Sequence, residues 1–292
     1  MERITFPPRI IFDEREKDAI LRVVEKTMTG PEAIDMYGKG PEVASYEKEF
    51  AEYFGVKYAA AVSSGTAAVH SAVGALRLEP GSEIITTPIT DPGTVAPILM
   101  QNCIPIFADV EYDTLNISPK SIEKNITDKT RAIIAVHLAG QPCDMDPIME
   151  IARRHNLYVI EDCAQAHGAR YKGRYVGTMG DLGVFSLMAG KHMNSGGQGG
   201  MVITNNEELY WNAKRFSDRG KPFNSEEKTN LLLGLNYRMT ELQAAVGRVQ
   251  LTKLADIKGK RRWVVERLRE GTSGLKMFQL WRFIDNVEVN PW

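Results

Sequence analysis

The sequence predicts an α/β protein, in which a mostly parallel sheet of seven strands is covered by helices on both faces. Short apolar runs alternate with longer segments of helical periodicity along most of the chain, and this alternation is typical of parallel sheets between two helical layers. The 292 residues, 43% of them hydrophobic and 25% charged, are enough for a substantial core. No internal repeat or low-complexity segment argues for another architecture.

The elements follow in order from these two patterns. Short, mostly apolar runs predict strands at residues 57–62, 83–87, 104–110, 132–137, 158–161, 184–186 and 201–204. Longer amphipathic stretches predict helices at residues 13–26, 43–53, 66–76, 144–155, 206–217 and 240–254. Sheets of this kind bind ligands at the carboxyl ends of their strands, so we expect the functional residues there.

Charge and cysteine content exclude several classes of protein. Lys and Arg number 36 against 37 Asp and Glu, which gives no indication of binding to nucleic acid or to an anionic membrane. The three cysteines show neither zinc spacing nor a disulfide framework, and no metal site is predicted. Residues 1–8 lack the apolar core of a signal peptide, and no run reaches membrane-spanning length. We therefore predict a soluble cytoplasmic protein.

The most informative residues are an acid and a lysine. Asp162 directly follows the strand predicted at 158–161, and Lys191 lies in a loop before the glycine cluster at 196–200. Enzymes that use pyridoxal 5′-phosphate (PLP) need such a pair: the acid holds the protonated pyridine nitrogen and the lysine forms a Schiff base with the aldehyde. Each residue alone is more often a helix cap or a solvated side chain. The pair together favours a PLP site.

A phosphate-binding turn is expected upstream, where a strand ends and a helix begins. The backbone amides of Gly65, Thr66 and Ala67 would point at a phosphate from the positive end of that helix. Simple N-capping by a serine or threonine explains the same pattern. Small residues on either side favour close approach, which supports the phosphate interpretation modestly.

The glycine cluster at 196–200 does not indicate a dinucleotide or nucleoside-triphosphate site. Its glycines precede a predicted strand, whereas a dinucleotide fingerprint follows a strand and opens a helix. No Gly-Lys-Ser/Thr follows, as a P-loop would require. Two histidines near the predicted site stay open: His167 is either a packed core imidazole or a neighbour of the cofactor ring, and His192 orients or fills space beside the lysine.

From about Ile20 to Arg262 the sequence resembles the DegT/StrS family of PLP-dependent sugar aminotransferases, which have fold type I. The resemblance is carried by several strings in order: Gly-Pro-Glu-Val at 40–43, Ala-Glu-Tyr-Phe-Gly-Val-Lys-Tyr at 51–58, Ser-Gly-Thr-Ala-Ala at 64–68, Val-His-Leu-Ala-Gly-Gln-Pro at 136–142, Glu-Asp-Cys-Ala-Gln-Ala at 161–166, the spacing from Ser186 to Lys191, and Gly-Leu-Asn-Tyr-Arg-Met-Thr-Glu-Leu-Gln-Ala-Ala at 234–245.

The resemblance implies a role for each site residue. Lys191 and Asp162 would be the catalytic pair, and Gln165 would contact the hydroxyl side of the cofactor ring. The cofactor phosphate would be held by Gly65, Thr66 and Ser186, together with Asn236 of a neighbouring subunit in a homodimer with shared active sites.

Three departures from the family pattern stand out. The loop at 88–94 carries no aromatic residue for stacking on the cofactor ring. The glycine cluster is one residue longer than usual, with Gln198 in place of the common glutamate. The family also extends beyond residue 292, so we expect a PLP-binding large domain at 1–246 and the start of a truncated small domain at 247–292.

The activity that the resemblance implies is amino-group transfer from glutamate or glutamine to a keto sugar, with a nucleotide-linked sugar expected, or to a keto cyclitol. Such reactions belong to sugar and polysaccharide biosynthesis. Two alternatives remain at this stage. Related sugar dehydratases use PLP but replace the lysine with histidine, whereas Lys191 is present here. A truncated homologue could bind PLP without turning over.

Overall fold

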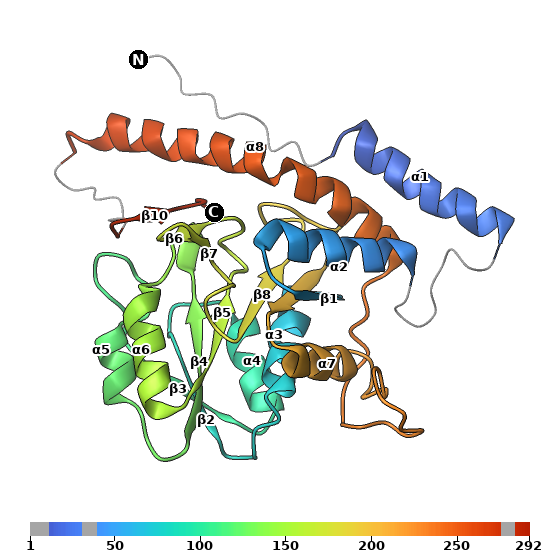
Figure 1. Ribbon diagram of the computed structural model, residues 1–292. Helices are drawn as coiled ribbons and strands as arrows, with labels where there is room; N and C mark the ends of the chain where they lie inside the picture. The colour runs from blue at the N-terminus through green and yellow to red at the C-terminus, as the bar shows by residue number, and fades with distance from the viewer. Residues whose placement is uncertain (1–11, 31–39, 276–283) are drawn as a thin grey trace.

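In the computed structural model, which describes residues 12–30, 40–275 and 284–292, the core is a seven-stranded sheet in the order β1-β9-β8-β5-β4-β2-β3 (Figure 1). Its strands are β1 (Tyr58–Val62), β2 (Glu83–Thr86), β3 (Ile104–Phe107), β4 (Thr130–Val136), β5 (Tyr158–Asp162), β8 (Leu182–Ser186) and β9 (Gly200–Thr204). Only β9 runs antiparallel to its neighbours. The predicted fold class is confirmed.

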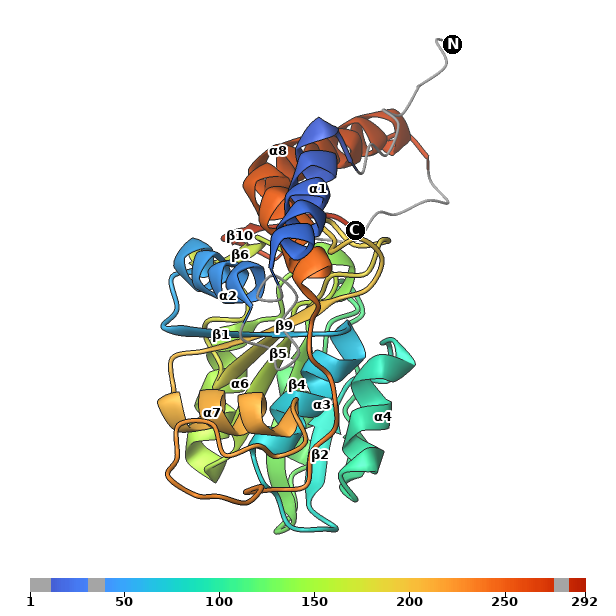
Figure 2. The ribbon, with the colours of Figure 1, turned by 90° about the vertical axis from the view of Figure 1, so that its right-hand side faces the viewer.

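Alternating side chains of the strands supply two separate apolar layers, one on each face of the sheet. One layer packs against α2 (Pro41–Phe54), α5 (Pro119–Lys124) and α6 (Met145–His155). The other packs against α3 (Gly65–Ala75), α4 (Pro92–Met100) and α7 (Glu207–Phe216). Figure 2 shows α4 and α6 on opposite sides of the sheet. Burial on both faces explains why the central strands are almost continuously apolar.

A long helix, α8 (Glu241–Thr272), crosses above the sheet, with α1 (Glu14–Thr29) beside its first half (Figure 1). Thr240 and Gln243 form a capping box at its start, so the N-terminus of α8 matches the predicted position. The helix continues well beyond the predicted end at residue 254. The proposed domain boundary after residue 246 falls inside this helix, and the two-domain division stays a prediction.

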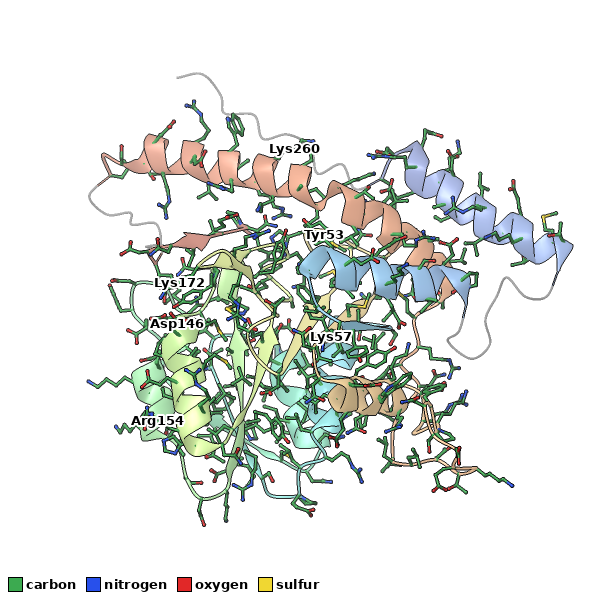
Figure 3. The ribbon with its side chains drawn as sticks, in the orientation of Figure 1. Tyr53, Lys57, Asp146, Arg154, Lys172 and Lys260 are labelled. Atoms are coloured by element: carbon green, nitrogen blue, oxygen red, sulfur yellow. The ribbon has the colours of Figure 1, made fainter. Side chains whose placement is uncertain are left out.

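A second, three-stranded sheet lies near the carboxyl edge of the main one. It pairs β10 (Val287–Glu288) with β6 (Arg170–Tyr171), which pairs in turn with β7 (Arg174–Tyr175). An ion pair between Lys172, in the turn after β6, and Asp146 of α6 joins this sheet to the main body (Figure 3). Sequence analysis did not predict this sheet, because two-residue strands leave no periodic pattern.

Two predicted boundaries near the expected site are wrong by a few residues. The segment at 88–94 was expected as a loop, but α4 begins within it at Pro92, where proline suits the first helical position. Asp162 was expected just after a strand and is instead the last residue of β5. Among the described residues, no helix combines the length and apolar character needed to cross a bilayer. Residues 1–8, which bear on the signal-peptide prediction, lie outside the described part.

Candidate active site

The predicted catalytic residues lie at the carboxyl edge of the sheet, where the fold class leads us to expect them. Asp162 ends the central strand β5, with Val136 of β4 and Val184 of β8 opposite it in register. Ser186 ends β8, and Lys191 lies in a turn five residues further on, its amide donating to the carbonyl of Met188. Parallel neighbours therefore bring residues far apart in sequence to one edge.

The carboxylate of Asp162 is almost fully buried, with 4% of the residue exposed, and it accepts two hydrogen bonds. The backbone amide of Ala164 donates to Oδ1 at 3.0 Å, and the hydroxyl of Thr94 donates to Oδ2 at 2.8 Å. Burial raises the pKa of Asp162, while these donors and the charge of Lys191 act in the opposite direction. A cationic partner at this carboxylate, such as a protonated ring nitrogen, would stabilise its ionised form.

Lys191 is half-buried and interacts electrostatically with Asp162. Burial lowers the pKa of Lys191, and the carboxylates of Asp162 and Asp91 partly offset that effect. The ring of Trp292 lies over the ammonium, with Nζ 4.4 Å from the ring centroid, and the indole N–H donates to the carbonyl of Gly190 at 3.3 Å. A lysine in this environment loses its proton more readily than an exposed one, as a nucleophile or base requires.

The start of α3 has the form of a phosphate-binding turn. Ser64 caps the helix by accepting from the amide of Ala67 at 3.0 Å, which leaves the first-turn amides of Gly65 and Thr66 without a partner inside the helix. A Cβ on Gly65 would lie 2.6 Å from Cβ of Ser186, so only glycine lets the two segments approach this closely. Three residues that the sequence assigned to the cofactor phosphate are thus brought together.

The remaining two predicted cofactor residues have different surroundings. Gln165 is half-buried, and its Oε1 accepts from the amide of Ala139 at 2.8 Å, which ties its loop to the end of β4. Asn236 is exposed. Its neighbour Tyr237 accepts from the amide of Ser63 at 2.7 Å, so the segment that carries Asn236 runs beside the phosphate-binding turn of the same chain.

His167 and His192 are both buried, and their Nδ1 atoms lie 3.3 Å apart. The Nε2 of His192 is 2.8 Å from the carbonyl oxygen of Asn290, and the side-chain amide of Asn290 donates to the carbonyl of His167. Residues 290–292 therefore connect the turn that carries Lys191 with the loop after β5. These contacts favour packing and orientation over a catalytic role for both histidines.

A buried polar cluster that no sequence pattern indicated lies behind Asp162. Glu161 faces the opposite side of the sheet, where its carboxylate accepts from the amides of Gly177, Met179 and Gly180 and lies 3.0 Å from Nε2 of His137. Ligand atoms of His137, Glu161 and Cys163 lie within 4.8 Å of one another, as a metal site would require. The hydrogen bonds already engage Glu161 and both ring nitrogens of His137, so the cluster has a structural explanation.

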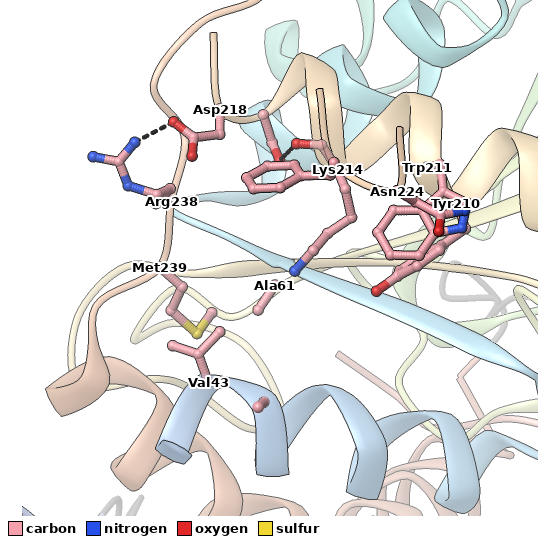
Figure 4. Close-up of a pocket in the computed structure, with 12 residues that line it drawn as sticks. Val43, Ala61, Tyr210, Trp211, Lys214, Asp218, Asn224, Arg238 and Met239 are labelled. Atoms are coloured by element: carbon pink, nitrogen blue, oxygen red, sulfur yellow. Dashed lines mark hydrogen bonds and ion pairs between the residues drawn. The ribbon is translucent and has the colours of Figure 1, made fainter. Parts of the chain in front are cut away.

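A cavity of about 350 Å³ lies elsewhere, between α2, β1 and α7 (Figure 4). Its charged lining residues are paired: Lys214 with Glu47 at 2.6 Å, and Arg238 with Asp218. None of the residues predicted for the cofactor site lines it. The cavity is therefore separate from the candidate active site.

Known proteins of one family are similar to this chain. A family model described as the DegT/DnrJ/EryC1/StrS aminotransferase family matches residues 16–292. The chain is 40% identical over 237 residues, 81% of its length, to the GDP-perosamine synthase of Escherichia coli O157:H7. It is 39% identical over 256 residues, 83% of its length, to a putative L-glutamine:3-amino-2,3-dideoxy-scyllo-inosose aminotransferase of Micromonospora echinospora.

Among solved structures, an aminotransferase from Psychrobacter cryohalolentis superposes with a TM-score of 0.86 at 40% identity, covering 94% of this chain and 70% of that one. The chain spans 65% and 61% of the length of the two curated relatives. It therefore corresponds to somewhat less than two thirds of each of those proteins.

Proposed function

The chain belongs to the DegT/DnrJ/EryC1/StrS aminotransferase family, and on that premise we propose that it is a PLP-dependent aminotransferase acting on a keto sugar or keto cyclitol. The observation that carries this proposal is the placement of buried Asp162, at the end of β5, and half-buried Lys191, in the turn after β8, at the same carboxyl edge of the sheet, where each charge affects the pKa of the other. The turn at Gly65 supports it, because the missing side chain lets Ser186 lie close to the first-turn amides of α3, so that both could contact one phosphate.

The residues present fit the cofactor at three points. Gly65, Thr66 and Ser186 would hold the phosphate, with Asn236 of a second subunit added in a homodimer. Asp162 would hold the ring nitrogen, and Gln165 would face the ring hydroxyl. When bound, PLP supplies an electron-accepting ring that stabilises the carbanion formed as an amino acid loses its Cα proton.

The protein's own residues then set the charge of the Asp162 carboxylate and transfer protons. The amide of Ala164 and the hydroxyl of Thr94 donate hydrogen bonds to Asp162 and favour its ionised form. The lowered pKa of Lys191 lets its Nζ act as an unprotonated amine that accepts a proton and returns it. The ring of Trp292 lies over that amine, with Nζ 4.4 Å from the ring centroid.

The substrates follow from the relatives. Glutamate or glutamine is the proposed donor, and the names of the two curated relatives support a sugar or cyclitol acceptor. A nucleotide-linked keto sugar is the first acceptor to test, since one relative is a GDP-perosamine synthase. A cytoplasmic location stays a prediction.

The test begins with the cofactor. Adding PLP should produce an absorbance band that requires the Schiff-base lysine, and Lys191→Ala should abolish it. Lys260→Ala is the control, because Lys260 is exposed on α8, where it forms an ion pair with Asp256 of the same helix (Figure 3). A band that persists in Lys191→Ala would show that the lysine has been misassigned.

Substrates then separate the three possible outcomes. Loss of the band with glutamate or glutamine, followed by nitrogen transfer to a keto sugar, supports the proposal. Loss of a sugar hydroxyl without nitrogen transfer would identify a dehydratase. A band that no amino acid changes would identify a binding protein without turnover.

A further inference from the structure

The segment at 90–94 lies between the two ends of the proposed cofactor site. It includes the N-cap of α4, Asp91, and the first turn of that helix. At Gly93, a Cβ would lie 2.7 Å from the hydroxyl oxygen of Thr66, so the start of α4 presses against the phosphate-binding turn. One residue later, Thr94 contacts Asp162. A single short segment thus touches the residues proposed for the phosphate and for the ring nitrogen.

The hydrogen bonds of this segment have a defined direction when Asp162 is ionised. An ionised carboxylate only accepts, so the single hydroxyl proton of Thr94 goes to Oδ2 of Asp162 at 2.8 Å. Thr90 must then be the donor in its 2.8 Å contact with the hydroxyl oxygen of Thr94. The result is a relay of two hydroxyls that ends on the carboxylate.

Because the relay is buried, loss of the Thr94 hydroxyl would leave Asp162 short of a hydrogen-bond donor. Thr94 is 2% exposed and Asp162 is 4% exposed, so water cannot readily replace the hydroxyl if it is removed. Oδ1 already accepts from the amide of Ala164, and the two donors together determine how the carboxylate plane is turned. The remaining lone pairs are those available to a cationic ring nitrogen.

We propose that Thr94 is a positioning residue for the cofactor: supported by Thr90, it orients the carboxylate of Asp162 toward the ring nitrogen. This inference rests on the proposed function. It gives the segment at 90–94, which lacks the aromatic residue expected from the family pattern, a polar role in its place.

The experiment compares two cofactors whose only difference is the ring nitrogen. Binding of PLP and of 1-deazapyridoxal 5′-phosphate, in which a C–H replaces that nitrogen, is measured for the wild type, Thr94→Val and Thr94→Ser. Thr94→Val should weaken PLP binding by about tenfold or more, as expected for a hydrogen bond to a charged group. Binding of the analogue should change by less than about twofold, because the analogue has no ring nitrogen to interact with the carboxylate of Asp162. Thr94→Ser should restore most of the preference for PLP.

Thr86→Val is the matched control. Thr86 is also buried, but its hydroxyl donates to a backbone carbonyl, that of Ile134 at 3.1 Å, and not to Asp162. The Thr86→Val variant should prefer PLP over the analogue as strongly as the wild type does.

The outcomes separate this inference from the proposed function. If the wild type prefers PLP but Thr94→Val weakens the binding of both cofactors equally, or of neither, the role of Thr94 is overturned and the proposed function is not. A wild type that binds no PLP, or binds both cofactors equally, overturns the pairing of Asp162 with the ring nitrogen and the inference with it.

Discussion

Burial of two histidines beside the lysine turn makes the folding equilibrium sensitive to pH. Burial, together with the nearby charge of Lys191, lowers the pKa of His167 to about 3. Burial also lowers the pKa of His192 well below its usual value, with His167 contributing. Both side chains are therefore neutral in the folded protein near neutral pH, whereas the unfolded chain binds their protons below about pH 6.5.

We predict that stability falls as the pH is lowered from 6.5 toward 3, because the unfolded state then binds more protons than the folded state. Between pH 6.5 and pH 5, one such histidine lowers the free energy of unfolding by up to about 2 kcal/mol. Urea denaturation at several pH values checks this. His167→Gln should flatten the slope in this window whatever its effect at pH 7, and an unchanged slope would contradict the assignment.

At the level of elements, two glycines in two helices have opposite consequences. Gly65 opens α3 against Ser186, where no Cβ fits. Gly259 lies inside α8, and nothing lies within 4 Å of where its Cβ would be. Glycine in an uncrowded helix interior costs stability relative to alanine because it loses more backbone entropy on folding. The same substitution therefore separates a functional glycine from an incidental one.

We predict that Gly65→Ala weakens PLP binding by at least about tenfold, because α3 must move away from Ser186 and the amides no longer converge on a phosphate. Gly259→Ala should leave PLP binding unchanged and raise the free energy of unfolding by about 0.5–1 kcal/mol. Cofactor titration and urea denaturation measure the two effects. Normal PLP affinity in Gly65→Ala would argue that the phosphate binds elsewhere.

The element boundaries also show where sequence patterns fail. Residues 88–94 contain two prolines and a glycine and were expected as a loop, yet proline at the first helical position is compatible with the start of α4. The second half of α8 is rich in charged residues and lacks an apolar stripe, so its periodicity is weak. Lys, Arg and Glu are nevertheless good helix formers, which explains how α8 continues to Thr272.

For the whole molecule, the open question is whether two chains share each site. Asn236 is exposed, and the family resemblance assigns it to the cofactor of a neighbouring subunit. The segment that carries it is anchored through Tyr237, whose hydroxyl lies 2.9 Å from Nδ1 of His70 in α3. We therefore propose that Asn236 is held rigidly enough to serve a second chain.

A subunit-mixing experiment tests this proposal. Lys191→Ala and Asn236→Ala should each reduce the lysine-dependent PLP band when alone. Mixed chains should recover part of it, because one site of each mixed dimer then pairs an intact Lys191 with an intact Asn236 from the other chain. Co-purification of the two variants, each carrying a different affinity tag, checks separately that the subunits exchange. No recovery despite exchange would mean that each site is built from one chain.

The sequence by itself determined the fold class and was enough to propose the principal site residues. Periodicity is a local property, and Asp162, Lys191 and Gly65 stand in short, recognisable strings, so both could be predicted without coordinates. Only the tertiary structure decided which side chains surround them. The hydroxyl of Thr94 reaches Asp162 across 68 positions, and Asn290 lies 98 positions from His192, which it contacts. The order of the strands in the sheet brings such distant residues together, and no local sequence pattern encodes that order.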